Sequence, residues 1–201
     1  MKSKTRDLDD KEPEQPDSDS IIWRYMDFAK FYSVVSASAI YLPSISALKA
    51  IDPFEGAVGA GIDEENSKIC YEVENFLNVD AGLSKHLSAE KFLRLVDAES
   101  KINFASCWCE LPHESDAMWK LYLKNPEQGV AIKTRYSALF GLADANSKDF
   151  KIGRISYEDY SGWKEIEKVF FTKRKAFTHE NEVRLVVRDN GSSNVGLDMP
   201  I

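Results

Sequence analysis

The sequence of 201 residues lacks the features that mark several large classes of protein. No apolar run is long enough to cross a bilayer, and the first residues, MKSKTRDLDD, contain no apolar segment that could act as a secretion signal. The three cysteines are too few for a disulfide framework, and reduced thiols are the usual state in the cytosol. We therefore expect a cytoplasmic protein with no membrane partner.

Basic charge and phosphate-binding loops are also scarce. Lysine and arginine number 26 against 33 aspartate and glutamate residues, which gives a net charge of −7. A protein that grips a nucleic-acid backbone needs the opposite balance, so this class of partner is disfavoured. Neither G-x-G-x-x-G nor G-K-[ST] occurs, which disfavours Rossmann and P-loop folds. Cys109 and His113 lack a second pair of ligands at zinc-site spacing, so we expect no metal site.

The first twenty residues differ in composition from the rest of the chain. Eleven of them are charged, and Leu8 is the only branched aliphatic residue. Such a segment cannot bury enough apolar surface to offset its loss of conformational entropy. We expect residues 1–20 to be a disordered charged leader and residues 21–201 to form a single α+β domain. Because the chain stops soon after a turn signal, we also expect a final element to be missing or to come from another chain.

Alternation and helical periodicity predict strands and helices that follow one another along the chain. The first three elements are strand, helix and strand, with Asp27 as the N-cap of the helix and Phe28, Phe31, Tyr32 and Val35 on one of its faces. Helices interleaved with short strands follow, which fits an α+β fold with small mixed or antiparallel sheets. The expected strands are 21–26, 39–42, 103–110, 129–134, 153–157 and 182–188, and the expected helices are 28–38, 114–125 and 136–142, with others that start near 88 and 166.

Two of these helices have an apolar face that we expect to be buried. The buried positions would be Phe92, Leu93, Leu95 and Val96 in the helix from 88, and Met118, Trp119, Leu121 and Tyr122 in the helix from 114.

The last predicted strand carries the most informative charges. Its alternation places Val183 and the two following odd-numbered apolar residues in the core, and Glu180, Glu182 and Arg184 on the other face. One interpretation is an ion-pair ladder in which Glu182 pairs with Arg184 or Lys173. The other is a catalytic carboxylate, Glu182, with Glu180 beside it and a neighbouring base that holds it in place.

Aromatic residues gather in clusters with polar neighbours. They include Trp23, Tyr25, Tyr41, Trp108 and Trp119. They could fill an aromatic core, or they could line a cleft that stacks a planar ligand such as nicotinamide or adenine.

The order of these motifs resembles a bacterial and phage family, the domain of unknown function 2971, which often occurs in mobile or defence-related contexts. The resemblance spans about residues 21 to 190 and rests on W-R-Y at 23–25, D-P-F-E at 52–55, M-W-x-x-Y at 118–122 and E-x-E-x-R at 180–184. The family name carries no activity.

The layout is also similar, more weakly, to that of ADP-ribosyltransferases, which implies a split sheet and NAD as substrate. In that superfamily an early basic residue holds the NAD ribose or phosphate, and a late glutamate stabilises the oxocarbenium-like transition state. The resemblance implies binding roles for Arg24, Tyr41 and Ser44 and a catalytic role for Glu182, with Glu180 as its helper. Tyr25 and Trp119 would complete the NAD-binding residues. The implied protein is an NAD-using defence or toxin effector.

Two other classes of function stay open. A non-catalytic module could bind a nucleotide or a protein partner through the aromatic residues. A nuclease could assemble Asp52, Glu180, Glu182 and Lys173 around a metal. Convergence of Arg24, Tyr41 and Glu182 on one cleft would favour the enzyme, whereas a sealed Glu182 would favour the ion-pair ladder.

Overall fold

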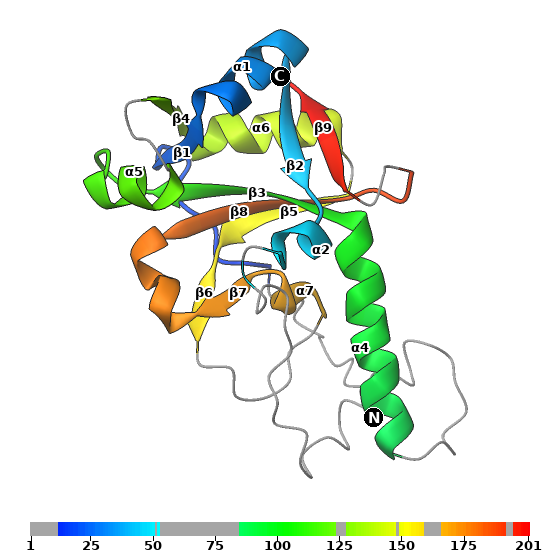
Figure 1. The fold of residues 1–201 in the computed structure, drawn as a ribbon. Coiled ribbons are helices and arrows are strands. Elements are labelled where there is room, and N and C mark those ends of the chain that lie inside the picture. The colour runs from blue at the N-terminus through cyan, green and yellow to red at the C-terminus, as the bar shows by residue number, and fades with distance from the viewer. Residues whose placement is uncertain are drawn as a thin grey trace, which may run out of the picture.

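A five-stranded antiparallel sheet forms the centre of the computed structural model, which describes residues 12–50, 52, 85–123, 128–147, 149–158, 166–191 and 195–201 (Figure 1). The strand order is β4-β1-β3-β8-β5, so strands that are distant in the sequence lie side by side. The strands are β1 (Ile21–Asp27), β3 (Asn103–Glu110), β4 (Gly129–Arg135), β5 (Phe150–Arg154) and β8 (Glu182–Arg188).

Both faces of the sheet are covered, and alternation assigns each residue to one of them. We call the face that carries Ile22, Trp108, Val183 and Leu185 the upper face, as it lies in Figure 1. The lower face is the one that carries Glu182. The alternate residues of β8 are buried on both sides, which explains why only Arg188 of that strand is exposed.

Two helices and a small sheet pack on the upper face. They are α1 (Phe28–Ala37), α6 (Tyr136–Asn146) and an antiparallel pair of strands, β2 (Ala39–Pro43) and β9 (Gly196–Pro200). Their buried apolar side chains meet those of the sheet in the largest core cluster, which includes Ile40, Leu42, Phe104, Leu139, Ile152 and Met199.

The remaining described helices and short strands pack below the sheet (Figure 1). Their apolar residues form two smaller core clusters, one centred on Val96, Phe170 and Val186 and the other on Tyr25, Cys109 and Met118. The elements are α2 (Ile45–Leu48), α4 (Lys85–Ile102), α5 (Asp116–Tyr122), α7 (Ile166–Val169), the 3-10 helix η3 (Lys175–Glu180), and the parallel pair β6 (Ser156–Glu158) and β7 (Thr172–Arg174).

The α+β class is confirmed, and so are many local expectations. Strands 103–110 and 182–188 have the expected bounds, and Asp27 caps α1 by accepting a hydrogen bond from the Lys30 N–H at 2.8 Å. None of the described helices has an apolar stretch that would let it cross a membrane.

Other expectations were wrong. The strand expected at 153–157 is two strands, because Ile155 leaves the ladder and the chain turns to pair with β7. By contrast, the helix expected to start near 166 is confirmed as α7, and the chain continues as β7 and η3 after one helical turn. Leu93, Leu121 and Tyr122 are exposed, because α4 and α5 each contact the body of the structure along a narrower stripe. Of the motif D-P-F-E, only Asp52 lies within the described residues.

Residues 12–20 lie against the domain, although they fall within the leader that we expected to be disordered; residues 1–11 lie outside the described part. The carbonyl of Glu14 accepts a hydrogen bond from the Arg154 N–H at 2.6 Å, and the Ser20 carbonyl accepts one from the Tyr136 N–H at 2.9 Å. Gly153 allows the backbone of Glu14 to lie close to β5, because a Cβ at position 153 would lie 2.8 Å from the Glu14 carbonyl oxygen. Hydrogen bonds to β5 and α6 therefore order a segment that has few apolar residues.

Candidate functional site

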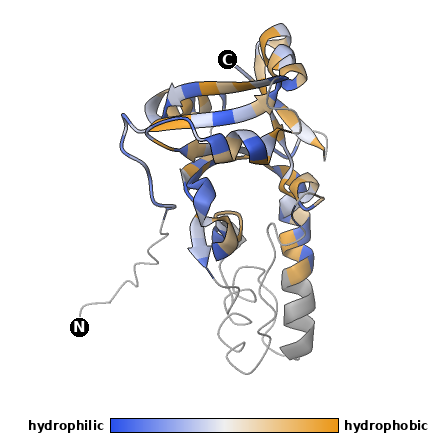
Figure 2. Cartoon of the chain, turned by 60° about the vertical axis from the view of Figure 1, so that its left-hand side comes forward, coloured by the Kyte–Doolittle hydropathy of each residue, from blue (hydrophilic) through white to orange (hydrophobic). Residues whose placement is uncertain are grey.

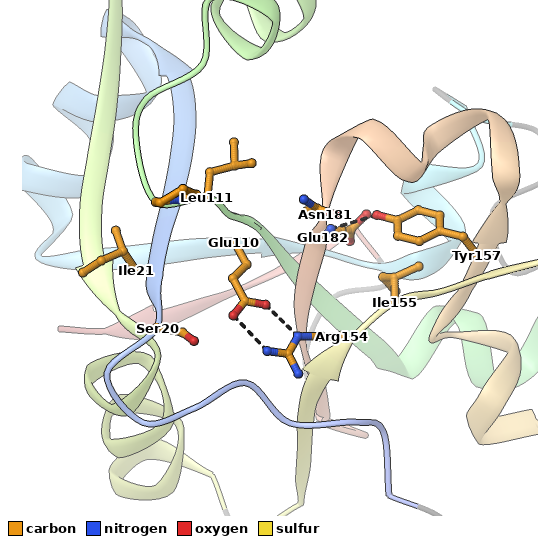
Figure 3. A pocket seen from close by; sticks show the side chains of 10 residues that line it. Ser20, Ile21, Glu110, Leu111, Arg154, Ile155, Tyr157, Asn181 and Glu182 are labelled. Carbon is orange, nitrogen blue, oxygen red and sulfur yellow. Dashed lines mark hydrogen bonds and ion pairs between the residues drawn. The ribbon is translucent and has the colours of Figure 1, made fainter.

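A cavity of about 590 Å³ opens at one end of the sheet, where β3 and β5 end and β1 and β8 begin (Figure 3). We call it the sheet-end pocket. Its volume falls in the range of roughly 300–1,000 Å³ that is typical of small-molecule sites. It is lined by Ser20, Ile21, Glu110, Leu111, Pro112, Arg154, Ile155, Tyr157, Asn181 and Glu182.

A bidentate ion pair forms one wall of the sheet-end pocket. Arg154 donates from Nε to Glu110 Oε2 at 2.7 Å and from Nη2 to Glu110 Oε1 at 2.9 Å (Figure 3). The Arg154 guanidinium keeps the pKa of Glu110 below its usual value, and a hydrogen bond from Ser20 adds to the effect. Arg154 also donates to Glu14 at 2.8 Å. Because its charge is shared between two carboxylates, this wall is fixed and attracts anions little.

Tyr157 and Asn181 form the opposite wall. The Tyr157 hydroxyl accepts a hydrogen bond from the Glu182 backbone N–H at 2.8 Å (Figure 3). Burial raises the pKa of Tyr157, so the hydroxyl keeps its proton at neutral pH and can donate it. Asn181 has a left-handed backbone (φ 41°), which asparagine tolerates, and its carbonyl accepts from the Glu110 N–H at 2.8 Å. The Asn181 side-chain amide forms no hydrogen bond with any of the described residues.

Directly behind this wall lies a cluster of four buried charges. Lys173 Nζ donates to Glu180 Oε2 at 2.6 Å and to Glu182 Oε2 at 3.1 Å. Arg184 donates from Nε to Glu182 Oε1 at 2.7 Å and from Nη1 to the Phe170 carbonyl at 2.7 Å. Only 1% of the Glu182 and Arg184 side chains is exposed. The four formal charges of this ion cluster cancel.

The two carboxylates of the ion cluster titrate differently. Burial alone would raise the pKa of Glu182, but Arg184 and Lys173 hold it at about 2. Burial raises the pKa of Glu180, and Lys173 opposes this shift only in part. Burial, together with Glu180 and Glu182, also raises the pKa of Cys109 to about 12, so this thiol is neutral and unreactive.

Tyr25 and Trp119 lie on the same lower side as the ion cluster but in the aromatic core. The Tyr25 ring meets the Trp119 ring edge-on at 5.1 Å and stacks with the Tyr122 ring at 6.4 Å. Its hydroxyl accepts a hydrogen bond from the Ser115 N–H at 2.9 Å. Tyr25 is therefore a buried anchor for α5 and is covered by the two other rings.

Arg24, Tyr41 and Ser44 lie away from Glu182. Arg24 donates to Ser106 Oγ and to the Tyr41 carbonyl, both at 3.0 Å, and its guanidinium lies 5.9 Å from the centre of the Trp108 ring. Ser44 is buried and its hydroxyl caps α2.

The strand register places Arg24 and Glu182 on opposite faces of the sheet. Trp23 pairs with Cys109, and Cys109 pairs with Glu182, so these three residues share the lower face. Arg24 is the next residue after Trp23 and therefore points to the upper face. The sheet-end pocket is lined by Glu182 but by neither Arg24 nor Tyr41.

Several residues of the sheet-end pocket could not be recognised as site residues from the sequence. Glu110, Arg154 and Tyr157 come from the ends of strands that only the folded sheet brings together. The one available signal was Asn181, which sits inside the E-x-E motif as a residue suited to a left-handed turn.

Among the described residues, no group of three or more histidine, cysteine, aspartate or glutamate side chains is placed to hold a metal ion. Asp52 contacts Arg174 at 3.3 Å. Comparison with protein-family models, curated proteins and solved structures finds no match to this chain. Membership of the domain of unknown function 2971 and similarity to ADP-ribosyltransferases therefore stay predictions.

Proposed function

We propose that this chain is a non-catalytic binding module that takes a small organic ligand in the sheet-end pocket. The observation that carries the proposal is the pairing of a ligand-sized cavity with two hydrogen-bonding groups that face it, the Tyr157 hydroxyl and the Asn181 amide. The walls around them are held by the Arg154–Glu110 ion pair, so the pocket needs little reorganisation to accept a ligand.

The lining favours a nucleoside over a nucleotide. Among the described lining residues, the charged groups that face the pocket are Arg154 and Glu110, and Arg154 is already shared between carboxylates. The Glu182 carboxylate lies behind the wall and is paired with Lys173 and Arg184. A phosphate group would therefore find no unpaired cation among the described lining residues to bind it. Ile21, Leu111 and Ile155 offer apolar surface to a planar base, and the Asn181 amide can pair with a ring nitrogen or a carboxamide.

The burial of the ion cluster supports a binding role over a catalytic one. A catalytic carboxylate must touch the reacting atoms, whereas the Glu182 carboxylate already accepts hydrogen bonds from two cations and has almost no exposed surface.

Thermal unfolding with a panel of compounds tests the proposal. We expect adenosine or nicotinamide riboside to stabilise the protein saturably and AMP to do so less, since a ligand at 100 times its Kd adds about 2.7 kcal/mol. Tyr157→Phe and Asn181→Ala should weaken binding at least fivefold. Tyr41→Phe is the matched control, because it removes a hydroxyl bonded to the Val195 carbonyl on the far side of the sheet. The absence of a saturable shift with every compound would refute the binding role.

A second candidate is the cleavage of NAD by the same region, as the resemblance to ADP-ribosyltransferases implies. One observation favours it: the Glu182 main chain forms part of the pocket wall, and its carboxylate is ionised directly behind it. In that reaction the ribosyl C1′–N bond breaks, nicotinamide leaves with the electron pair, and water or an acceptor adds at C1′. Nicotinamide release by the wild-type protein but not by Glu182→Asp, at equal ligand binding, would establish this activity.

A further inference from the structure

Helix α1 exposes an apolar stripe. Phe28, Tyr32 and Val35 are 58%, 64% and 58% exposed, and no residue of the helix is fully buried. The spacing i, i+4, i+7 places these three side chains on one side, and the half-buried Phe31 borders them. Val34 packs against the upper core and so holds the opposite side of the helix in place. Figure 1 shows α1 at the top of the molecule, and Figure 2 shows this region as largely hydrophobic.

We propose that this stripe pairs with the same stripe of a second copy of the chain, with the two α1 helices antiparallel. An exposed row of large apolar side chains on a helix marks an interaction surface. A stripe that serves a twofold interface must be complementary to itself.

The shape of the stripe meets that requirement. Tyr32 lies near its middle, with Phe28 about one turn before it and Val35 about one turn after it. In an antiparallel pair Tyr32 therefore faces its own equivalent. The large Phe28 ring faces the small Val35 side chain of the other copy, so the gaps along the seam are filled evenly.

The charges favour the antiparallel arrangement and a neutral partner. The only charged residue in α1 is Lys30, and it pairs with the N-cap Asp27 at 3.4 Å, so both charges lie at the same end. A parallel pair would bring these charges against their own equivalents, whereas an antiparallel pair keeps them at opposite ends of the seam. A strongly acidic or basic partner would find no counter-charge on this stripe.

Another exposed apolar residue, Ile201, lies next to the end of α1. Ile201 is 61% exposed and donates a backbone hydrogen bond to the Ser38 carbonyl at 2.9 Å, directly after α1. Even so, a seam of a few side chains per copy is smaller than the roughly 1,200 Å² in total that marks the lower end of stable complexes. We therefore expect a dimer that dissociates in the micromolar range.

Sedimentation equilibrium over about 1 to 200 µM tests the pairing, since a micromolar dimer dissociates within this window. The wild-type protein should change from monomer to dimer, and Tyr32→Glu should stay monomeric at least tenfold higher in concentration. Leu121→Glu is the matched control, because Leu121 is a similarly exposed apolar residue on α5 and should leave dimerisation unchanged. Far-UV circular dichroism and the thermal midpoint check that both variants fold, as expected for substitutions at exposed positions.

Two results would overturn the proposal. The first is a wild-type protein that stays monomeric at every concentration, which would leave the stripe to an apolar partner of another kind. The second is equal loss of association in Tyr32→Glu and Leu121→Glu, which would place the interface elsewhere. Phe28→Ala gives an independent check, because it shortens the side chain without adding charge and should weaken the dimer.

Discussion

Arg24 and Glu182 project from opposite faces of the central sheet. They belong to strands that are separated in the sheet only by β3, yet the register through Trp23 and Cys109 places Glu182 below and Arg24 above. The sheet therefore lies between the two side chains. Of the two residues, only Glu182 lines the sheet-end pocket.

The ion cluster should be essential for stability. Replacing Glu182 by Gln would leave Lys173 and Arg184 with one carboxylate between them, and we expect a loss of about 3–5 kcal/mol in the free energy of unfolding. The measurement is urea unfolding followed by fluorescence. Asp116→Asn is the control, since its ion pair with Lys120 is fully on the surface and should contribute less than about 1 kcal/mol. Equal effects of the two substitutions would contradict this account.

The two carboxylates of the ion cluster should give opposite pH dependences. Glu182 has a pKa of about 2 in the folded protein, below the ordinary value of 4.5. Its contribution to the free energy of unfolding is therefore present above pH 4.5 and is lost as the pH falls towards 2. Glu180 has a raised pKa, so the folded state holds its proton more tightly and is destabilised as the pH rises through that range. The measurement is the unfolding free energy of the wild-type protein and of Glu180→Gln between pH 3 and 7. The effects of Glu110 and other groups that both proteins share cancel in the difference between the two. The two free energies should therefore converge at low pH. A constant difference would show that Glu180 does not titrate in this way.

Gly153 should resist substitution while Gly141 should not. A Cβ at Gly153 would lie 2.8 Å from both the Glu14 carbonyl oxygen and Pro13 Cβ, so Gly153→Ala should cost about 1–3 kcal/mol and release residues 12–20. Gly141 lies in α6 and has no atom within 4 Å of the position that a Cβ would take, so Gly141→Ala should stabilise the protein by about 0.5–1 kcal/mol. Thermal unfolding and limited proteolysis of the N-terminal segment would measure both effects. Unchanged proteolysis in Gly153→Ala would argue against the docked segment.

Ser38 should tolerate only one kind of replacement. It ends α1 in the left-handed conformation (φ 48°), which strains any residue with a Cβ. Ser38→Gly should therefore raise stability by a few tenths to about 1 kcal/mol, and Ser38→Val should lower it by more. The thermal midpoints of the two variants should lie on opposite sides of the wild-type value.

Local patterns were enough to predict β8, β3 and the Asp27 cap, because alternation and a capping residue act over a few positions. The position of Glu180 could not be predicted from local patterns. It was expected on β8, but Asn181 adopts a left-handed backbone and ends η3 between the two glutamates. Glu180 nevertheless meets Glu182, because Lys173 from β7 bonds both carboxylates. The pairing of Glu182 with Arg184 or Lys173 was one of the two expected interpretations, and both bonds form. The bond from Lys173 to Glu180 was not expected, because it joins residues of different elements.

The candidate site depended even more on distant contacts. The sheet-end pocket gathers Ser20, Glu110, Arg154 and Asn181 from four parts of the chain. Strand β9 was missed for the same reason, since its pairing with β2 joins residues near the two ends of the described chain. Composition and periodicity describe segments one at a time, so they cannot place the ends of strands beside one another.

The strand order has a consequence for how the protein is made. Strand β8 lies between β3 and β5, yet it is synthesised after both of them. Until residue 188 has left the ribosome, β3 and β5 each lack a neighbour on the side that β8 will occupy, and the core on both faces is incomplete. Folding of the central sheet must therefore wait until β8 has been synthesised, and the growing polypeptide presents unpaired strands of the kind that chaperones bind.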